Sequence, residues 1–131
     1  AAMLLATDWP SYAEDLPATL IKSVTAISGV FNLEPIPHLP TNEDIQLDAD
    51  MARRLSPHFL KPAHEAPLSV IVGGSELPEF VRQSRDFADT WDTHLSNIGY
   101  LELCGLNHFT IVDTMDRADD PITTRILAHM E

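Results

Sequence analysis

Cysteine is almost absent from this chain. The single cysteine, Cys104, excludes an internal disulfide, so the chain needs no oxidising compartment and we expect a cytoplasmic protein. Cys104 lies in an apolar stretch and has no cationic neighbour in the sequence that would stabilise a thiolate. We therefore expect a buried and chemically inert thiol.

Basic residues and long apolar runs are also scarce. There are 8 Lys and Arg against 20 Asp and Glu, which gives a formal net charge of -12. Such a surface repels phosphate backbones and anionic lipid, so we expect neither nucleic acid nor a membrane as a partner. No apolar run approaches the roughly 18 residues that cross a bilayer, and residues 1–6 lack the basic flank of a signal peptide. The acidity then serves mainly solubility.

Motifs that hold metals or phosphates are missing as well. None of the six histidines stands in an H-x-x-x-H spacing with a third partner, which is the pattern typical of a metal site. Gly73 and Gly74 are adjacent, but the other elements of a phosphate-binding loop are lacking. We therefore expect no metal and no cofactor.

What the chain does contain is an alternation of β-branched apolar runs and helical patterns. Three prolines between Phe31 and Pro40 predict an extended surface loop there. The runs predict strands over Ile21–Ser28, Leu68–Val72 and Ile98–Cys104. The helical patterns predict helices over residues 1–6, Asp48–Leu55, Leu77–Leu95, His108–Met115 and Pro121–Met130.

This alternation predicts an α/β fold, with a mostly parallel sheet covered by helices on both faces. Three parallel strands alone leave a sheet edge unpaired, so we expect something beyond them to complete the sheet. Residues 1–6 resemble the tail of a buried helix that has no N-cap. We therefore expect residues 1–131 to be a single partial domain that lacks its N-terminal half.

Two loops at predicted strand ends carry side chains suited to catalysis. Glu76 follows the second strand in the stretch GGSE, and His108 follows the third strand in the stretch GLNH. In open α/β sheets, functional groups gather beyond the carboxyl ends of the strands. A carboxylate bonded to one imidazole nitrogen leaves the other free to take a proton from a nucleophile. The spacing alone also suits a helix N-terminal carboxylate and a structural histidine.

The stretch VIVGGSELPEFVRQSRDFA, residues 70–88, resembles the acid loop and following helix of kynurenine formamidase (arylformamidase) and related bacterial esterases. The stretch GLNHFTIVD, residues 105–113, resembles the histidine loop of the same family. Residues 28–36, residues 52–57 and the opening AAMLLATDW are similar to further segments, so the resemblance covers essentially the whole chain.

The resemblance implies the C-terminal half of an α/β-hydrolase in which His108 is the catalytic base and Glu76 the acid. The family usually has aspartate where Glu76 stands, and glutamate keeps the carboxylate while adding one methylene. Glu79 is a rival acid that we expect to be a solvated first-turn carboxylate. No serine matches a G-x-S-x-G elbow, because Ser75 directly precedes the acid and Ser28 is expected to be structural.

The implied function of the complete protein is a serine hydrolase that cleaves a small carboxylic ester or an aryl formamide, while the chain alone is expected to be inactive. The expected protein partners are a second copy in a homo-oligomer or the missing N-terminal half. The alternative is a non-catalytic fragment or binding module that keeps the fold. The catalytic hypothesis predicts that Glu76 lies within hydrogen-bond reach of a His108 ring nitrogen.

Overall fold

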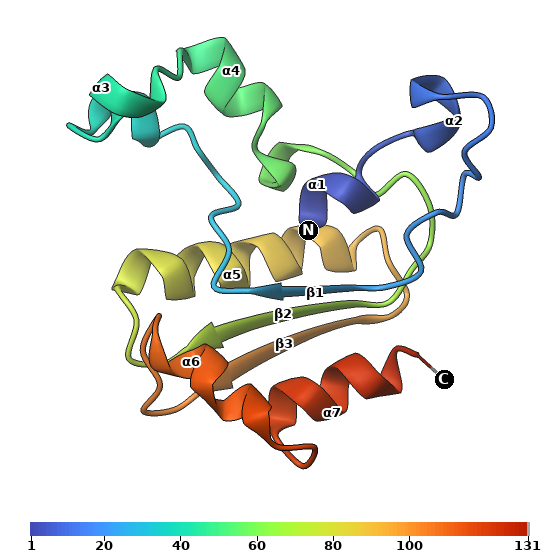
Figure 1. The fold of residues 1–131 in the computed structure, drawn as a ribbon. Helices are drawn as coiled ribbons and strands as arrows, with labels where there is room; N and C mark the ends of the chain where they lie inside the picture. The colour runs from blue at the N-terminus through green and yellow to red at the C-terminus, as the bar shows by residue number, and fades with distance from the viewer. Residues whose placement is uncertain (131) are drawn as a thin grey trace.

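The computed structural model describes residues 1–130 and has the α/β architecture that the alternating pattern predicts (Figure 1). The central strand is buried along its whole length, as its nearly continuous apolar run predicts. The outer strand that follows it in sequence is only partly covered. One parallel sheet is formed, in the order β1 (Val24–Ile27), β2 (Leu68–Gly73) and β3 (Ile98–Leu103).

Helices cover both faces of this sheet, and neighbouring strand residues enter opposite cores. Val70 contributes to the core beneath α1 (Ala2–Leu5) and α5 (Pro78–Asp92). Ile71, the next residue, contributes to the core beneath α6 (Thr110–Asp113) and α7 (Pro121–Ala128) (Figure 1). This alternation is the period of two that a strand imposes on its side chains.

Helix α5 is the main cover of the first face, and its apolar stripe explains why it forms. Pro78 stands in the first turn, where a backbone N–H would have no partner within the helix, so proline costs no hydrogen bond. Phe87 is fully buried and stacks on Phe31, with ring centroids 4.1 Å apart. Trp91 is also fully buried and donates its Nε1 proton to the Pro57 carbonyl at 3.1 Å. Each such side chain stabilises the fold by about 1.5–3 kcal/mol through burial.

The segment between β1 and β2 is an excursion of short helical turns. The predicted extended loop was wrong at Ile36–His38, which forms a 3-10 turn (η1), because Pro37 is tolerated in a first turn. The predicted second helix is confirmed as α4 (Ala49–Arg54), and Asp48 caps it by accepting from the Met51 N–H at 2.7 Å. The remaining short helical elements are α2 (Trp9–Tyr12), α3 (Asn42–Ile45), η2 (Pro57–Phe59) and η3 (Thr114–Asp116).

The prediction of a buried thiol was wrong. Cys104 is exposed, because β3 ends one residue earlier, at Leu103, and the chain turns outward there. Gly105 completes that turn with a φ of +79°, a backbone conformation that glycine adopts without steric cost. The turn directs the chain toward the histidine loop.

Both outer strands of the sheet are edges among residues 1–130. β1 pairs only with β2 in this part of the chain, so its other edge has no strand partner there. Across the same residues, no helix is both long and apolar enough to span a membrane.

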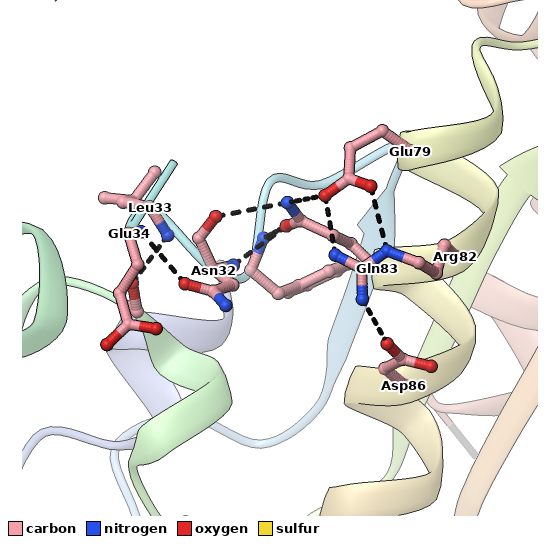
Figure 2. Close-up of polar contacts among 9 residues, drawn as sticks. Asn32, Leu33, Glu34, Glu79, Arg82, Gln83 and Asp86 are labelled. Carbon is pink, nitrogen blue, oxygen red and sulfur yellow. Dashed lines mark hydrogen bonds and ion pairs between the residues drawn. The ribbon is translucent and has the colours of Figure 1, made fainter. Parts of the chain in front are cut away.

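A buried glutamine fixes the loop after β1 to helix α5 (Figure 2). Gln83 Oε1 accepts from the backbone N–H groups of Phe31 and Asn32, at 2.9 and 2.8 Å. Gln83 Nε2 donates to the Asn32 carbonyl at 3.1 Å and to Glu79 at 2.9 Å. One side chain therefore satisfies three backbone groups of a loop that has no strand partner at this point.

Replacing Gln83 by alanine is expected to lower the free energy of unfolding by about 1–3 kcal/mol, because buried backbone donors lose their acceptor. Urea denaturation followed by circular dichroism measures this change. The control is Asp89→Ala, an exposed position on the same helix, for which we expect a change within about 0.5 kcal/mol. Equal effects of the two substitutions would contradict the role given to Gln83.

Candidate functional site

Two loops meet at the carboxyl ends of β2 and β3, and backbone hydrogen bonds hold them together. The Gly74 N–H donates to the Leu103 carbonyl at 2.8 Å, and the Ser75 N–H donates to the Leu106 carbonyl at 2.9 Å. A Cβ at Gly73 would lie 2.3 Å from the Leu106 carbonyl oxygen, so only glycine permits this approach. The turn after β2 is thereby fixed against the turn after β3.

This junction brings Glu76 and His108 into contact. The Glu76 Oε2 atom lies 2.8 Å from the His108 Nδ1 atom, which is the contact that the sequence predicts. The Glu76 side chain is fully buried, whereas 45% of the His108 side chain is exposed. The Nδ1 edge of the imidazole is thus held by a buried carboxylate, while the rest of the ring is accessible to solvent.

The buried carboxylate is satisfied by three donors from three segments of the chain. Glu76 Oε1 accepts from the Ser28 hydroxyl at 2.5 Å and from the Gly73 N–H at 2.8 Å, while Oε2 faces His108. Burial alone would raise the pKa of Glu76, but the hydrogen bonds from Ser28, Gly73 and His108 together outweigh it. The pKa of Glu76 therefore lies below its ordinary value, and the carboxylate is ionised at neutral pH.

His108 lies in a loop rather than in the predicted helix over His108–Met115, which was wrong in its start. Asn107 Oδ1 accepts from the N–H groups of Phe109 and Thr110, at 2.9 and 3.0 Å, which forms a turn around His108, and α6 begins only at Thr110. The imidazole packs against Phe80, with ring centroids 4.7 Å apart, and against Phe109 at 5.7 Å. These two aromatic contacts and the hydrogen bond to Glu76 together fix the orientation of the imidazole ring.

No hydrogen bond joins the Nε2 atom of His108 to another group in residues 1–130, so this atom is available to another molecule or segment. The Ser28 hydroxyl is directed at Glu76, and Ser75 belongs to the turn that joins the two loops. In the described residues, no serine hydroxyl is bonded to the imidazole.

Glu79, the rival acid, lies in the first turn of α5 and is half exposed. Bidentate hydrogen bonds from Arg82, with a further one from Gln83, lower the pKa of Glu79 to about 2. Its carboxylate is therefore engaged in a surface ion pair, in agreement with the solvated first-turn position expected from the sequence (Figure 2).

Ser28 belongs to the hydrogen-bonded cluster around Glu76, a contact that the sequence did not predict, since it indicated only a structural role for this serine. It stands at the end of β1 with a φ of +50°, a region that side chains other than glycine seldom adopt. The strand end that precedes Glu76, that of β2, is the neighbour of this one in the sheet, and the strand end that precedes His108, that of β3, lies on the far side of β2. A polar residue at a third strand end was the available signal, although its partner lies 48 residues away.

Comparisons with known proteins point to hydrolases. No family model matches the chain. The chain is 29% identical to kynurenine formamidase of Salmo salar over 136 residues, covering 99% of the chain and 45% of that protein. It is 28% identical to kynurenine formamidase of Danio rerio over 120 residues, covering 88% of the chain and 40% of that protein.

A solved structure gives the same indication. The chain superposes with a TM-score of 0.81 and 25% identity on a crystal structure described as a "putative thioesterase" from Silicibacter sp. tm1040. The match covers 96% of the chain and 45% of that structure. These likenesses support a hydrolase-like family. The chain spans less than half the length of the proteins that it matches.

Ser28→Ala is expected to lower the free energy of unfolding by about 1.5–3 kcal/mol, because a buried ionised carboxylate loses a charge-assisted hydrogen bond. Ser11→Ala is a matched control, since Ser11 also donates to a carboxylate, Asp8, at 2.6 Å, but on the exposed surface. We expect its effect to stay within about 0.5 kcal/mol by urea denaturation. A similar loss of unfolding free energy in both variants would show that the Ser28–Glu76 hydrogen bond adds no more stability than an exposed one.

The stability conferred by Glu76 should depend on pH in a defined direction. Because its pKa is lower in the folded protein, its contribution is present above the unfolded value of about 4.3 and is lost as the pH falls through the folded pKa. The difference in free energy of unfolding between wild type and Glu76→Gln should therefore shrink as the pH falls below about 4. Glu43→Gln, at an exposed position in α3, is the control. A gap that keeps its size from about pH 4 to about pH 2 would contradict the assignment.

Proposed function

We propose that the complete protein containing this chain is a serine hydrolase of the α/β-hydrolase type, with His108 as catalytic base and Glu76 as the acid that positions it. The observation that carries the proposal is the 2.8 Å contact between the buried Glu76 carboxylate and the half-exposed His108 ring. A buried, ionised carboxylate on Nδ1 fixes the tautomer in which Nε2 is the basic atom. The free Nε2 of His108 supports the same role.

In the proposed reaction a serine hydroxyl attacks the carbonyl carbon of the substrate, and His108 Nε2 takes the hydroxyl proton. The imidazolium is stabilised by Glu76, which stays ionised. His108 then returns the proton to the leaving alcohol or amine as the carbonyl–leaving-group bond breaks. Water, deprotonated by the same ring, releases the acyl group from the serine.

The serine and the oxyanion hole are proposed to come from outside these 131 residues. They would be supplied by the N-terminal half of a longer protein or by a partner chain. The outer edge of β1 is the proposed docking position, because its backbone groups lack a strand partner among residues 1–130. A hollow of about 290 Å³ beside this edge, lined by residues that include Ala2, Ala26 and Leu55, supports the placement.

The substrate class is proposed from the relatives. Two are kynurenine formamidases and one structural neighbour is described as a thioesterase, and all these names imply cleavage beside a carbonyl group. We propose a small carboxylic ester or an aryl formamide. The non-catalytic alternative is favoured by one observation only, namely that no serine in the described residues reaches His108.

Hydrolysis of p-nitrophenyl acetate and of an aryl formamide by the complete protein tests the proposal. His108→Ala should lower kcat/KM by roughly three orders of magnitude or more, and Glu76→Gln by roughly two to four orders. Glu76→Asp should retain more activity than Glu76→Gln, because it keeps the charge. The 131-residue chain alone should show no turnover.

His94→Ala is the control, since His94 is an exposed histidine near the opposite end of α5. Its kcat/KM should stay within about twofold of wild type. Full activity in His108→Ala, or turnover by the isolated chain that survives this substitution, would refute the proposed mechanism and favour a binding module.

A further inference from the structure

An apolar pocket opens beside the catalytic pair, between the loop after β1 and the first turns of α5. It encloses about 370 Å³, which lies in the size range of small-molecule sites. Its wall is mainly aliphatic, with one aromatic ring. The apolar lining residues are Val30, Pro35, Ile36, Leu39, Leu77 and Phe80.

The pocket adjoins the proposed catalytic site through Phe80. Phe80 lines the pocket and also packs on the His108 ring, with centroids 4.7 Å apart. Gly29, another lining residue, directly follows Ser28, which bonds the Glu76 carboxylate. A group seated in the pocket therefore lies one aromatic side chain away from His108.

Most polar side chains in the wall already have hydrogen-bond partners. The Gln83 amide is bonded to Phe31, Asn32 and Glu79, and the Glu79 carboxylate is bonded to Arg82 and Gln83 (Figure 2). Asn32 accepts from the Glu34 N–H through its Oδ1 atom, and its neutral Nδ2 group is a donor left over. Arg82, which bonds the Glu79 carboxylate of the wall, is itself held by Glu79 and by Asp86. A ligand carboxylate would therefore enter a mainly apolar wall that already holds the Glu79 carboxylate, and it would face a chain of net charge -12.

Exposed apolar side chains at the mouth point to an apolar occupant. Leu77 is 70% exposed, and Val30 and Leu39 are 42% and 46% exposed. Phe109, which also packs on the His108 ring, is 79% exposed. Apolar side chains gathered around a concave site are the usual lining of a ligand pocket.

We propose that this pocket binds the uncharged apolar group, an alkyl chain or an aromatic ring, that flanks the scissile carbonyl. The inference rests on the proposed function, and it adds a substrate preference. Uncharged esters or amides with a sizeable hydrocarbon group are favoured at this position, and substrates that place a carboxylate there are rejected.

Binding to the chain itself tests the inference without any need for turnover. The uncharged fluorescent probe N-phenyl-1-naphthylamine is titrated into the protein and then displaced by hexanol or by hexanoate. Wild type should bind the probe, hexanol should displace it, and hexanoate should compete at least tenfold more weakly. Equal competition by the alcohol and the carboxylate would overturn the proposal.

Two leucine substitutions locate the site. Leu77→Glu should weaken probe binding at least tenfold, whereas Leu127→Glu should leave it within twofold. Leu127 is also half exposed, but it lies on α7, which covers the other face of the sheet. Ile36→Glu, on the opposite wall, should repeat the Leu77→Glu result. Unchanged binding in Leu77→Glu and Ile36→Glu, or equal loss in Leu127→Glu, would show that the pocket is not the site.

The outcome separates this inference from the proposed function. Probe binding that survives His108→Ala while hydrolysis is lost supports both. Loss of hydrolysis in His108→Ala, without probe binding in wild type, overturns the pocket assignment alone. Probe binding sensitive to Leu77→Glu, together with full hydrolysis in His108→Ala, leaves the pocket assignment standing and refutes only the catalytic mechanism.

Discussion

The structure of the candidate site depends on one buried negative charge. The Glu76 carboxylate is removed from water entirely, and such a group is stable only when its oxygens are hydrogen-bonded. Its three donors come from the end of β1, from the last residue of β2 and from the loop after β3. The carboxylate therefore ties three strand ends together and at the same time orients the imidazole. Stability and the proposed chemistry use the same interactions.

A second polar residue, Gln83, has a comparable role between the loop after β1 and helix α5. Its side chain is buried under that loop and satisfies the loop's backbone groups from the helix. The loop forms one wall of the apolar pocket, and α5 forms the other. Because both walls are joined through Gln83, the pocket is a feature of the packed structure and does not depend on the loop alone. Its position beside His108 follows from the same helix, since Phe80 belongs to α5.

Much of the fold was accessible from local patterns. The unbroken apolar run at Leu68–Val72 predicted a strand buried on both sides, and β2 is such a strand. The helical stripe after Pro78 predicted α5, and Asp48 predicted the start of α4. The failures occurred where chain turns decide the outcome. Cys104 lies one residue beyond the end of β3, and the turn that Asn107 forms around His108 places the following helix start at Thr110.

The sequence by itself determined which residue types stand at the strand ends, because strand periodicity and glycine turns are local properties. It therefore placed Glu76 and His108 at adjacent tips of a parallel sheet. Only the tertiary structure decided that Ser28, 48 residues away, completes the carboxylate cluster, and that Leu77, Phe80 and Ile36 enclose one pocket. Such contacts join segments that are distant in the chain. Their formation depends on how the loop after β1 packs on α5, and no local pattern encodes that packing.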